Sequence, residues 1–428
     1  MTPPSIPVPL GNSPVPQNES VGLFLGAGAS FELGMPLVWH LTGEFKGYFT
    51  PEHLCELNAG WRRQGGGYND SVIEDTIALL KRDDLHYENI LGYLETVSRR
   101  PGEPFAEQYG AMYQRMVELV YLLLYPRQAG SLRYIQQGLA PFEGLAGFAR
   151  KCSPVWAFSL NHDLMLHLMA THCGIPLRDG FWPDKTLTVF GNRPGVPRAS
   201  LLADILSGDD LNHGNLHLFR PGEFGINLLR IHGALDIFAF SDGLDLCRLR
   251  PVGSDLGGPL TALCLVNEEI GYWDHGGKAR VINEIAYTDE SGQEQFLQRT
   301  LLAGAQKFNK RFSQRLPQKV LDLFRSHINY VQKLYVVGYS FGDAHVDLVL
   351  RNWLEFSGER SIVIVDPGRR SIPAHFAHLA LQIETKNLTA GQFFADYREE
   401  PMTPLQNQEQ QDRAARRPEF EQKAGKKW

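Results

Sequence analysis

The sequence predicts an α/β protein built on a doubly wound parallel sheet, and two patterns along the chain lead to this fold class. First, five short apolar runs are rich in Val, Leu and Ile and have the length of buried strands: residues 21–25, 154–160, 227–232, 333–338 and 361–365. Second, each run is followed by turn residues, and most are then followed by apolar residues at helical spacing. Continuous apolar strands that alternate with helices are typical of a parallel sheet covered on both faces.

The composition is that of a globular protein rather than of a nucleic-acid-binding or membrane protein. The chain has 428 residues, 43% of them hydrophobic, and a net charge of −6, so no general attraction to nucleic acid or to an anionic membrane is expected. Its apolar runs are shorter than the roughly 20 residues of a membrane helix, and the N-terminus lacks a signal-peptide pattern. We therefore expect a cytoplasmic protein with two or three lobes, or one enlarged domain with insertions.

We expect one ordered domain, residues 20–397, between two irregular ends. Six prolines in the first 16 residues predict a flexible Pro-rich arm over residues 1–19. The tail, residues 398–428, mixes both charges with Gln, Pro and Ala, and is expected to be disordered or ordered only by a partner. Two insertions interrupt the domain. About 50–150 is predicted to be helical, because apolar residues recur on one helix face, and about 178–225, rich in Gly, Pro, Asn and Asp, is predicted to be loops.

A glycine loop directly follows the first apolar run and reads Gly26-Ala27-Gly28-Ala29-Ser30. A tight glycine turn between a strand and a helix presents backbone N–H groups and the positive end of the helix to an anion. Gly26 and Gly28 would let a phosphate approach the backbone, and Ser30 would cap the next turn or donate to a phosphate oxygen. A glycine turn that holds no ligand is the alternative.

Two common nucleotide-binding motifs are excluded by the residues that follow this loop. A P-loop ends in Lys followed by Ser or Thr, whereas Ser30 leads here into Phe31. A dehydrogenase fingerprint has a third Gly or Ala at position 31 and an acidic residue at the end of a second strand about 20 residues on. Position 31 is Phe, and Glu44 lies in a stretch with helical character. The loop is therefore not expected to belong to a P-loop protein or to a dehydrogenase.

Polar residues also follow the other apolar runs. They are Asn161, His162 and Asp163 after the second run, His232 and Gly233 at the end of the third, Gly338, Tyr339 and Ser340 at the end of the fourth, and Asp366 after the fifth. Parallel sheets bind ligands in a crevice outside the carboxyl ends of their strands. We therefore expect these residues to face one crevice together with the glycine loop.

No metal site is expected. His162, His167 and His172 repeat every five residues, which turns each side chain by about 140° on a helix, so the three cannot converge on one ion. His213 and His217 have the spacing of a zinc pair but lie in a Gly- and Asn-rich stretch, where a surface loop is expected. The five cysteines stand far apart without a CxxC pair, so reduced thiols are expected rather than a structural zinc site.

In chain order these motifs resemble those of the sirtuin (Sir-two) superfamily. The matching segments are the glycine loop, the turn Gly34-Met35-Pro36, Asn161 and Asp163, His232 with Gly233, and Gly338 with Ser340. The resemblance extends from Val21 to about Ile383 and is interrupted by the two insertions. It implies a Rossmann-like NAD-binding domain. The residues that it places along the dinucleotide are Gly26, Ala27, Gly28, Ser30, Pro36, Gly338, Tyr339 and Ser340.

Two departures indicate the branch of the superfamily. Deacetylating sirtuins continue the Gly-x-Pro turn with Asp-Phe-Arg and carry a four-cysteine zinc module, whereas this chain continues with Leu37-Val38-Trp39 and has no such cysteines. The Pro-x-x-Trp continuation and the segment GYSFGDAHVD look like those of bacterial sirtuin-like NAD+ glycohydrolases (NADases) of anti-phage defence. The resemblance therefore implies a hydrolase that cleaves NAD+, as its substrate, to nicotinamide and ADP-ribose and acts as the toxic effector of abortive infection.

Each catalytic candidate has an implied role and an alternative. The nicotinamide leaving group is already cationic, so its release needs stabilisation of an oxocarbenium-like centre and an aimed water rather than a general acid. The resemblance implies that Asn161 holds the ribose hydroxyls and that water, although a strand-end Asn also caps helices. His232 fits a general base. Asp163 orients Asn161, binds ribose or caps a helix, and Asp366 meets the adenine ribose or forms an Asp-Pro turn.

An NAD+ hydrolase that was always active would kill its host, so a trigger is expected. The sirtuin-like segments use nearly all of the ordered chain, so we expect control by self-assembly or by another protein. Sirtuin-like defence proteins of this size resemble those paired with a HerA-family hexameric ATPase, which we favour together with a homo-oligomer, or with a short prokaryotic Argonaute. Two other functions remain open, an NAD-dependent protein deacylase and a non-catalytic nucleotide-sensing scaffold.

Overall fold

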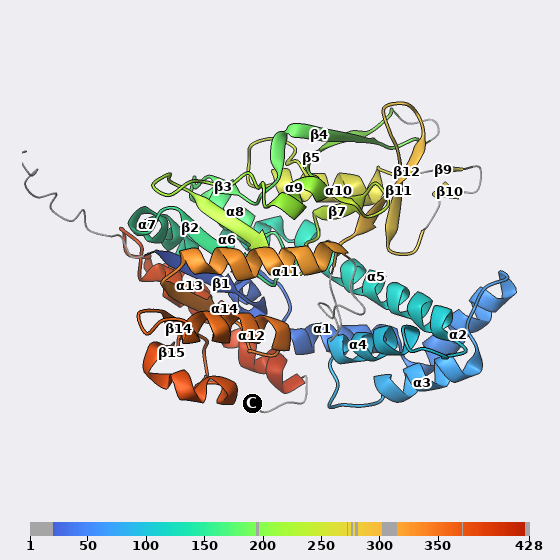
Figure 1. The fold of residues 1–428 in the computed structure, drawn as a ribbon, viewed down its shortest axis with the longest axis horizontal. Helices are drawn as coiled ribbons and strands as arrows, with labels where there is room; N and C mark the ends of the chain where they lie inside the picture. The colour runs from blue at the N-terminus through green and yellow to red at the C-terminus, as the bar shows by residue number, and fades with distance from the viewer. Residues whose placement is uncertain are drawn as a thin grey trace, which may run out of the picture.

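The computed structural model describes residues 20–423 except 194–196, 272, 275–276, 279–280, 302–314 and 370. The predicted arm, residues 1–19, lies outside the described residues. The described chain forms a parallel sheet with helices around it, a small antiparallel barrel and a lobe of helices (Figure 1). Within this part of the chain, no helix is both long and apolar enough to cross a membrane.

A seven-stranded parallel sheet forms the core, with the order β15-β14-β13-β1-β2-β6-β3. Its strands are β1 (Val21–Leu25), β2 (Val155–Ser159), β3 (Leu177–Arg178), β6 (Ile226–Arg230), β13 (Lys333–Val337), β14 (Ser361–Val365) and β15 (Ile383–Lys386). All five predicted apolar runs are strands of this sheet, so the prediction of an α/β fold with a parallel sheet is confirmed. Sequence reasoning missed the edge strands β3 and β15, which contain no continuous apolar run.

The order of the strands places a topological switch point between β1 and β13. The chain runs from β1 to β2 and then to β6 on one side, whereas β13 leads through α12 (Ala344–Glu355) to β14 and β15 on the other side. Connections that leave neighbouring strands in opposite directions open a crevice outside the carboxyl ends of those strands. The fold itself therefore indicates where a ligand would bind.

Helices occupy the chain between β1 and β2. They are α1 (Val38–Tyr48), α2 (Pro51–Arg63), α3 (Asp70–Leu80), α4 (Tyr87–Ser98), α5 (Ala106–Gly130), α6 (Leu132–Gly138), η3 (Ala140–Glu143) and α7 (Gly144–Lys151). Thr50 and Asn69 start α2 and α3 because their side chains accept backbone N–H bonds of the first turn. The apolar face of α4 is buried. This region coincides with the predicted helical insertion.

The prediction of a loop-rich insertion over about 178–225 is wrong, because this segment supplies two strands of a closed six-stranded barrel. In barrel order the strands are β11 (Glu284–Thr288), β12 (Glu294–Arg299), β7 (Ile237–Phe240), β8 (Asp245–Leu249), β5 (Ser200–Leu206) and β4 (Trp182–Phe190). Much of β4 is exposed, so its sequence lacks an apolar run. Its partner β5 follows only after the segment 191–199, which is longer than a tight hairpin turn, and its other partner β11 lies far along the chain.

The prediction of a disordered tail is also wrong for the described part of residues 398–428, where Pro404–Lys423 forms helix α14. Arg413 is buried, and its guanidinium donates to the carbonyl oxygens of Glu32 (2.9 Å) and Tyr134 (2.8 Å). The Glu32 carboxylate accepts bonds from the Thr389 hydroxyl (2.9 Å) and the Gly391 N–H (2.7 Å). Because these partners lie far away in the sequence, the polar composition of the tail gave no sign of its docking.

We expect Arg413→Ala to destabilise the protein by roughly 2 kcal/mol, because buried carbonyl groups of Glu32 and Tyr134 lose charged donors. Urea unfolding followed by circular dichroism measures this change. Gln411→Ala, on the exposed side of the same helix, is the matched control and should leave stability within about 0.5 kcal/mol of wild type. Equal stability of the two variants would contradict the docking of α14.

Candidate functional site

Five strands of the sheet end in a single row, and this row sets the floor of the candidate site. Leu25 of β1 pairs with Ser159 of β2 and with Val337 of β13. Beyond them, Ser159 pairs with Arg230 of β6, and Val337 pairs with Val365 of β14. The loops that carry the polar residues predicted from the sequence therefore all leave the sheet at the same level.

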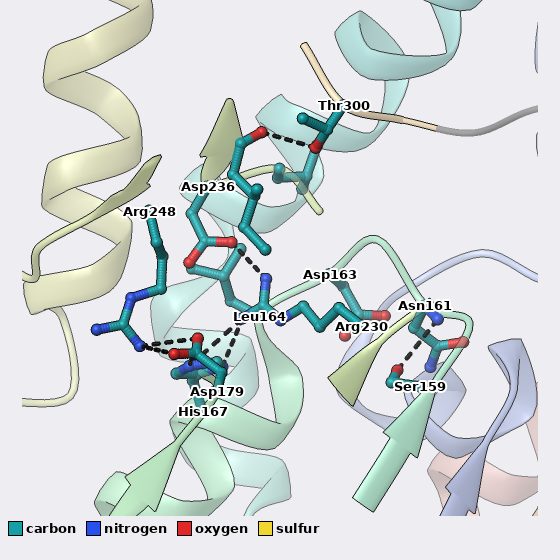
Figure 2. A network of polar contacts seen from close by, with 12 residues as sticks. Ser159, Asn161, Asp163, Leu164, His167, Asp179, Arg230, Asp236, Arg248 and Thr300 are labelled. Carbon is teal, nitrogen blue, oxygen red and sulfur yellow. Dashed lines mark hydrogen bonds and ion pairs between the residues drawn. The ribbon is translucent and has the colours of Figure 1, made fainter. Parts of the chain in front are cut away.

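Asn161 and His232 occupy equivalent positions, each two residues beyond the paired ends Ser159 and Arg230. The Asn161 amide donates to the Gly26 carbonyl (2.9 Å) and to the Ser30 hydroxyl (3.0 Å). Its backbone N–H donates to the Ser159 hydroxyl (3.1 Å), as Figure 2 shows. The structure therefore brings Asn161 against the glycine loop.

The glycines of the loop serve a different purpose from the one predicted. A Cβ atom on Gly26 would lie 2.6 Å from the Gly338 carbonyl oxygen, and one on Gly28 would lie 2.7 Å from the Gly338 Cα. The N–H groups of Gly26 and Gly28 donate to the carbonyls of Val337 (3.0 Å) and Gly338 (2.9 Å). Gly338 itself has a φ of 64°, which favours glycine. These glycines let the loops after β1 and β13 touch, and two of the expected phosphate donors bond to protein instead.

The rest of the glycine loop forms two short 3-10 turns, at Ala27–Ala29 and Phe31–Leu33. The N–H groups of Ala29 and Ser30 donate back to Gly26 and Ala27 within the loop. Pro36 is buried in the turn that leads on to α1. Backbone hydrogen bonds therefore hold the segment after β1 in place. Its polar groups near Asn161 include the Ser30 hydroxyl.

Asp163 bonds to the start of the helix that follows it, α8 (Met165–His172). Its carboxylate accepts the Met165 N–H at 3.0 Å. Burial raises the pKa of Asp163, whereas hydrogen bonds from Met165 and from the Ser30 hydroxyl act to lower it. The sequence left three roles open for Asp163: it could orient Asn161, bind ribose or cap a helix. The structure shows the contact with the helix.

His232 is buried, and its Nε2 lies 3.2 Å from Oδ2 of Asp343, within ion-pair distance. Asp343 is the N-cap of α12, where its Oδ1 accepts the N–H groups of His345 (3.1 Å) and Val346 (3.2 Å). One carboxylate oxygen is thus held by the helix and the other faces the imidazole. Sequence reasoning missed Asp343, although an Asp directly before a helical pattern is an N-cap signal.

Tyr339 and Ser340 follow β13 and point in different directions. The Tyr339 hydroxyl is buried and donates to Asp347 Oδ1 (2.8 Å), whose Oδ2 lies 3.0 Å from the His375 ring. Burial raises the pKa of Asp347 to about 6. Tyr339 therefore anchors α12 with its hydroxyl, whereas Ser340 is exposed.

Asp366 follows β14 and lies beside the loop after β13. Its Oδ2 is 3.5 Å from Nε of Arg369, which donates through Nη2 to the Ser340 carbonyl (3.3 Å). The Arg369 guanidinium also lies 5.2 Å from the centre of the Phe341 ring. Sequence reasoning missed Arg369, because nothing in its local sequence indicates that it spans two loops.

A buried ion network lies under the His232 side of the site (Figure 2). Arg230, two residues before His232, forms an ion pair with Asp236 and contacts Nδ1 of His167 at 2.6 Å. Burial lowers the pKa of His167, and Arg230 lowers it further, so the neutral ring can accept the bond from Arg230. The end of β6 is thereby fixed in place.

The same network continues into the barrel. Asp179 lies 3.5 Å from the His167 ring and accepts two bonds of 2.8 Å from Arg248 of β8. Burial alone would raise the pKa of Asp179, but Arg248 and His167 hold it well below its usual range. Arg248 also bonds to Asp204 of β5 at 2.6 Å. The network therefore joins the sheet to the barrel with its charges paired.

The histidines weighed as metal ligands lie in separate places. His167 belongs to the buried network, His213 is an exposed residue of the short helix α9 (Gly208–His213), and His217 bridges to Gly180. Among the described residues, no group of three or more His, Cys, Asp and Glu side chains could hold a metal ion. The five cysteines, all of which lie among the described residues, form no disulfide bond with one another.

A cavity of about 320 Å³ lies on the barrel side of the site. Its walls come from β6, the barrel, α5 and α11 (Arg315–His327). Gly233, the residue after His232, lines it, together with Leu229 of β6, Ile231 just beyond this strand, and Arg99 and Arg299. Neither Asn161 nor His232 lines this cavity, so it adjoins the candidate site without containing it.

We expect Asp347→Asn to change how stability depends on pH. A carboxyl whose pKa is raised by folding to about 6 makes the unfolding free energy fall as pH rises from about 4 to 6, because the folded state holds the proton longer. The difference in unfolding free energy, variant minus wild type, should increase over that range and level off above it. Denaturant unfolding at several pH values measures it, and a constant difference would contradict the assignment.

No protein-family model matches the chain, and no curated protein matches its sequence. The resemblance to sirtuin-like proteins therefore rests on the sequence motifs alone.

Proposed function

We propose that the protein is an NAD+ glycohydrolase, which cleaves NAD+ to nicotinamide and ADP-ribose. The observation that carries this proposal is the meeting of Asn161, the glycine loop and the His232–Asp343 pair at the switch point of one parallel sheet. An amide that can hold ribose hydroxyls and a buried histidine backed by a carboxylate are the groups that this hydrolysis needs.

The proposed cleavage of the nicotinamide–ribose bond depends on the charged groups near His232. Cleavage of the nicotinamide–ribose bond releases a neutral base and leaves positive charge on the ribose carbon and ring oxygen. The Asp343 carboxylate faces His232, and Asp163, two residues after Asn161, bonds to the start of α8. His232 then takes a proton from the attacking water or from a ribose hydroxyl. Water completes the product as ADP-ribose.

The distribution of charge along the crevice favours one orientation of the dinucleotide. The Asp343 carboxylate lies at His232, whereas Arg369, which pairs with Asp366, lies on the other side beside β14. NAD+ is likewise polar, with a cationic nicotinamide at one end and an anionic pyrophosphate toward the adenosine. We place the nicotinamide near His232 and the adenosine near Asp366, because this arrangement pairs opposite charges.

Two other functions use the same dinucleotide site. An NAD-dependent protein deacylase would release nicotinamide only with an acylated peptide and would form an acylated ADP-ribose. A non-catalytic nucleotide-sensing scaffold would bind NAD+ without turnover. Incubation of the protein with NAD+, with and without an acetylated peptide, followed by separation of the products, distinguishes the three. We favour hydrolysis because the chain departs from the deacetylating motif after Pro36 and lacks grouped cysteines.

The biological role that we propose is that of a toxic effector in anti-phage defence by abortive infection. The support is the resemblance of the GYSFGDAHVD segment and the Pro-x-x-Trp turn to sirtuin-like defence proteins. Activation would then depend on a homo-oligomer and on a partner, for which we favour a HerA-family ATPase over a short prokaryotic Argonaute. Product release measured with and without the purified partner tests this role.

We expect Asn161→Ala and His232→Ala each to lower nicotinamide release, the latter by about 10² to 10⁴-fold, because a general base contributes that much. Chromatography of the products from NAD+ measures the rates. His213→Ala, an exposed histidine in α9, is the matched control and should retain wild-type activity. Wild-type rates in the His232 variant would contradict the assigned role.

Asp343→Asn tests the positioning of His232 by its carboxylate partner. Asn caps helices about as well as Asp, so α12 should remain folded while the negative charge is lost. We expect kcat to fall by about tenfold or more with little change in KM, because the group acts on the reacting end only. Asp343→Glu should restore part of kcat. A fall in thermal stability with unchanged kcat would instead identify Asp343 as a structural cap alone.

A further inference from the structure

The cavity of about 320 Å³ beside β6 is not used by the proposed hydrolysis, because neither Asn161 nor His232 lines it. Much of its wall is aliphatic and comes from the end of β6, the barrel and the segments around α9 and α11. These side chains are Leu206, Leu211, Leu216, Leu229, Ile231, Ile237, Ala239, Leu246, Val320 and Leu323. A largely apolar cavity with a few polar groups is the usual form of a small-molecule site. At about 30 Å³ for each water-sized group, this volume holds roughly ten such groups.

Arg299, at the end of β12, places a buried donor on the wall of this cavity. Its side chain is 7% exposed. Nη1 lies 3.4 Å from Oε1 of Glu118, and the guanidinium lies 4.4 Å from the centre of the Tyr121 ring. Nε is buried and makes no hydrogen bond with any residue that the structure describes. A buried N–H without an acceptor is costly, so this atom indicates that an acceptor from outside the chain binds here.

A buried acceptor lies next to this donor. Asn283 accepts the backbone N–H of Arg299 with its carbonyl oxygen (3.1 Å), and it also lines the cavity. Its Nδ2 donates to Oε1 of Gln114 (3.0 Å), whereas its Oδ1 is buried and has no hydrogen-bond partner in the described part of the chain. An occupant that matches this wall therefore accepts one hydrogen bond and donates another.

The charges around the cavity favour an uncharged occupant. Each of the three arginines on the wall already has a carboxylate beside it: the pairs are Arg99–Glu95 (3.1 Å), Arg230–Asp236 and Arg299–Glu118 (3.4 Å). The wall also contains the carboxylates of Asp179 and Glu284. An anionic ligand would find no positive charge without a counterion here, and burying its charge would cost free energy.

We propose that this cavity binds a small aliphatic ligand whose uncharged head group carries both a carbonyl oxygen and an N–H donor, as a primary carboxamide does. The carbonyl oxygen accepts from Nε of Arg299, an N–H donates to Oδ1 of Asn283, and the chain lies against the aliphatic wall. Octanamide, with about ten non-hydrogen atoms, matches the volume. Because Gly233 lines the same cavity, the ligand contacts the loop that carries His232 without occupying the proposed NAD+ site.

Isothermal titration calorimetry of the full chain with octanamide tests the proposal, and three related compounds serve as comparisons. A buried methylene contributes about fourfold in affinity, so hexanamide should bind about tenfold more weakly than octanamide. Octanoate is charged, and N,N-dimethyloctanamide has no N–H donor, so each should bind at least about threefold more weakly. Absence of octanamide binding, or octanoate binding as tight as that of octanamide, would overturn the proposal.

Two variants test whether octanamide binds in this cavity. Ala239→Leu fills the cavity and should abolish binding, while circular dichroism shows that the variant is folded. Arg299→Lys keeps the positive charge beside Glu118 but removes the Nε donor, so the affinity for octanamide should fall by about tenfold or more. Unchanged affinity in both variants would place the ligand elsewhere and overturn the proposal.

Asn283→Gly tests the acceptor with a closely matched control. Asn283 has a φ of 59°, which glycine adopts without strain, so the variant loses the side-chain amide while the backbone is preserved. We expect its affinity for octanamide to fall by about threefold or more. Asp242→Gly replaces an exposed residue with a φ of 54° and should bind as wild type does. Equal affinities of the two variants would contradict the role of Asn283. Because no NAD+ is present, these titrations do not depend on the proposed hydrolysis.

Discussion

The backbones of two loops touch where Gly28 lies against Gly338, and the candidate site depends on this contact. The hydrogen bond of 2.9 Å between them ties the end of β1 to the end of β13 at the switch point of the sheet. Asn161 is then placed by its bond to Gly26 on one side. On the other side, the turn that begins at Gly338 leads into the cap residue Asp343, which faces His232. A side chain at either glycine would meet backbone atoms, so both halves of the site would have to move.

Two further sets of buried polar contacts support this arrangement from outside. The network through Arg230 and Asp179 fixes the strand that carries His232 and joins it to the barrel. On the opposite side, Glu32, two residues after Ser30, is held by the elements around Thr389 and Arg413. Contacts with the C-terminal helix α14 therefore stabilise the glycine loop, and contacts with the barrel stabilise the strand that carries His232. Charged groups buried in pairs of this kind are costly to break one at a time.

The sequence predicted the parts of the molecule whose signals are local. Each apolar run of a central strand is visible because both faces of the sheet are covered, and the residue after each run falls at the crevice by topology alone. The barrel was missed because β4 is largely exposed and because the barrel closes on β11, which lies far along the chain. Asp343 and Arg369 were missed for a related reason, since their partners, His232 and Ser340, are far away in the chain. The sequence located the glycines at the turn after β1, but their contact with the opposite loop is a tertiary feature that no local pattern shows.

The central claim is that a dinucleotide lies across the ends of β1 and β13 with its reactive ribose between Asn161 and His232. An experimental structure of the protein soaked with ADP-ribose tests this claim most directly. We expect the reactive ribose to contact Asn161 and His232, and the adenosine to lie beside Asp366 and Phe341. ADP-ribose bound in the cavity beside Gly233, with Asn161 and Asp366 untouched, would contradict it.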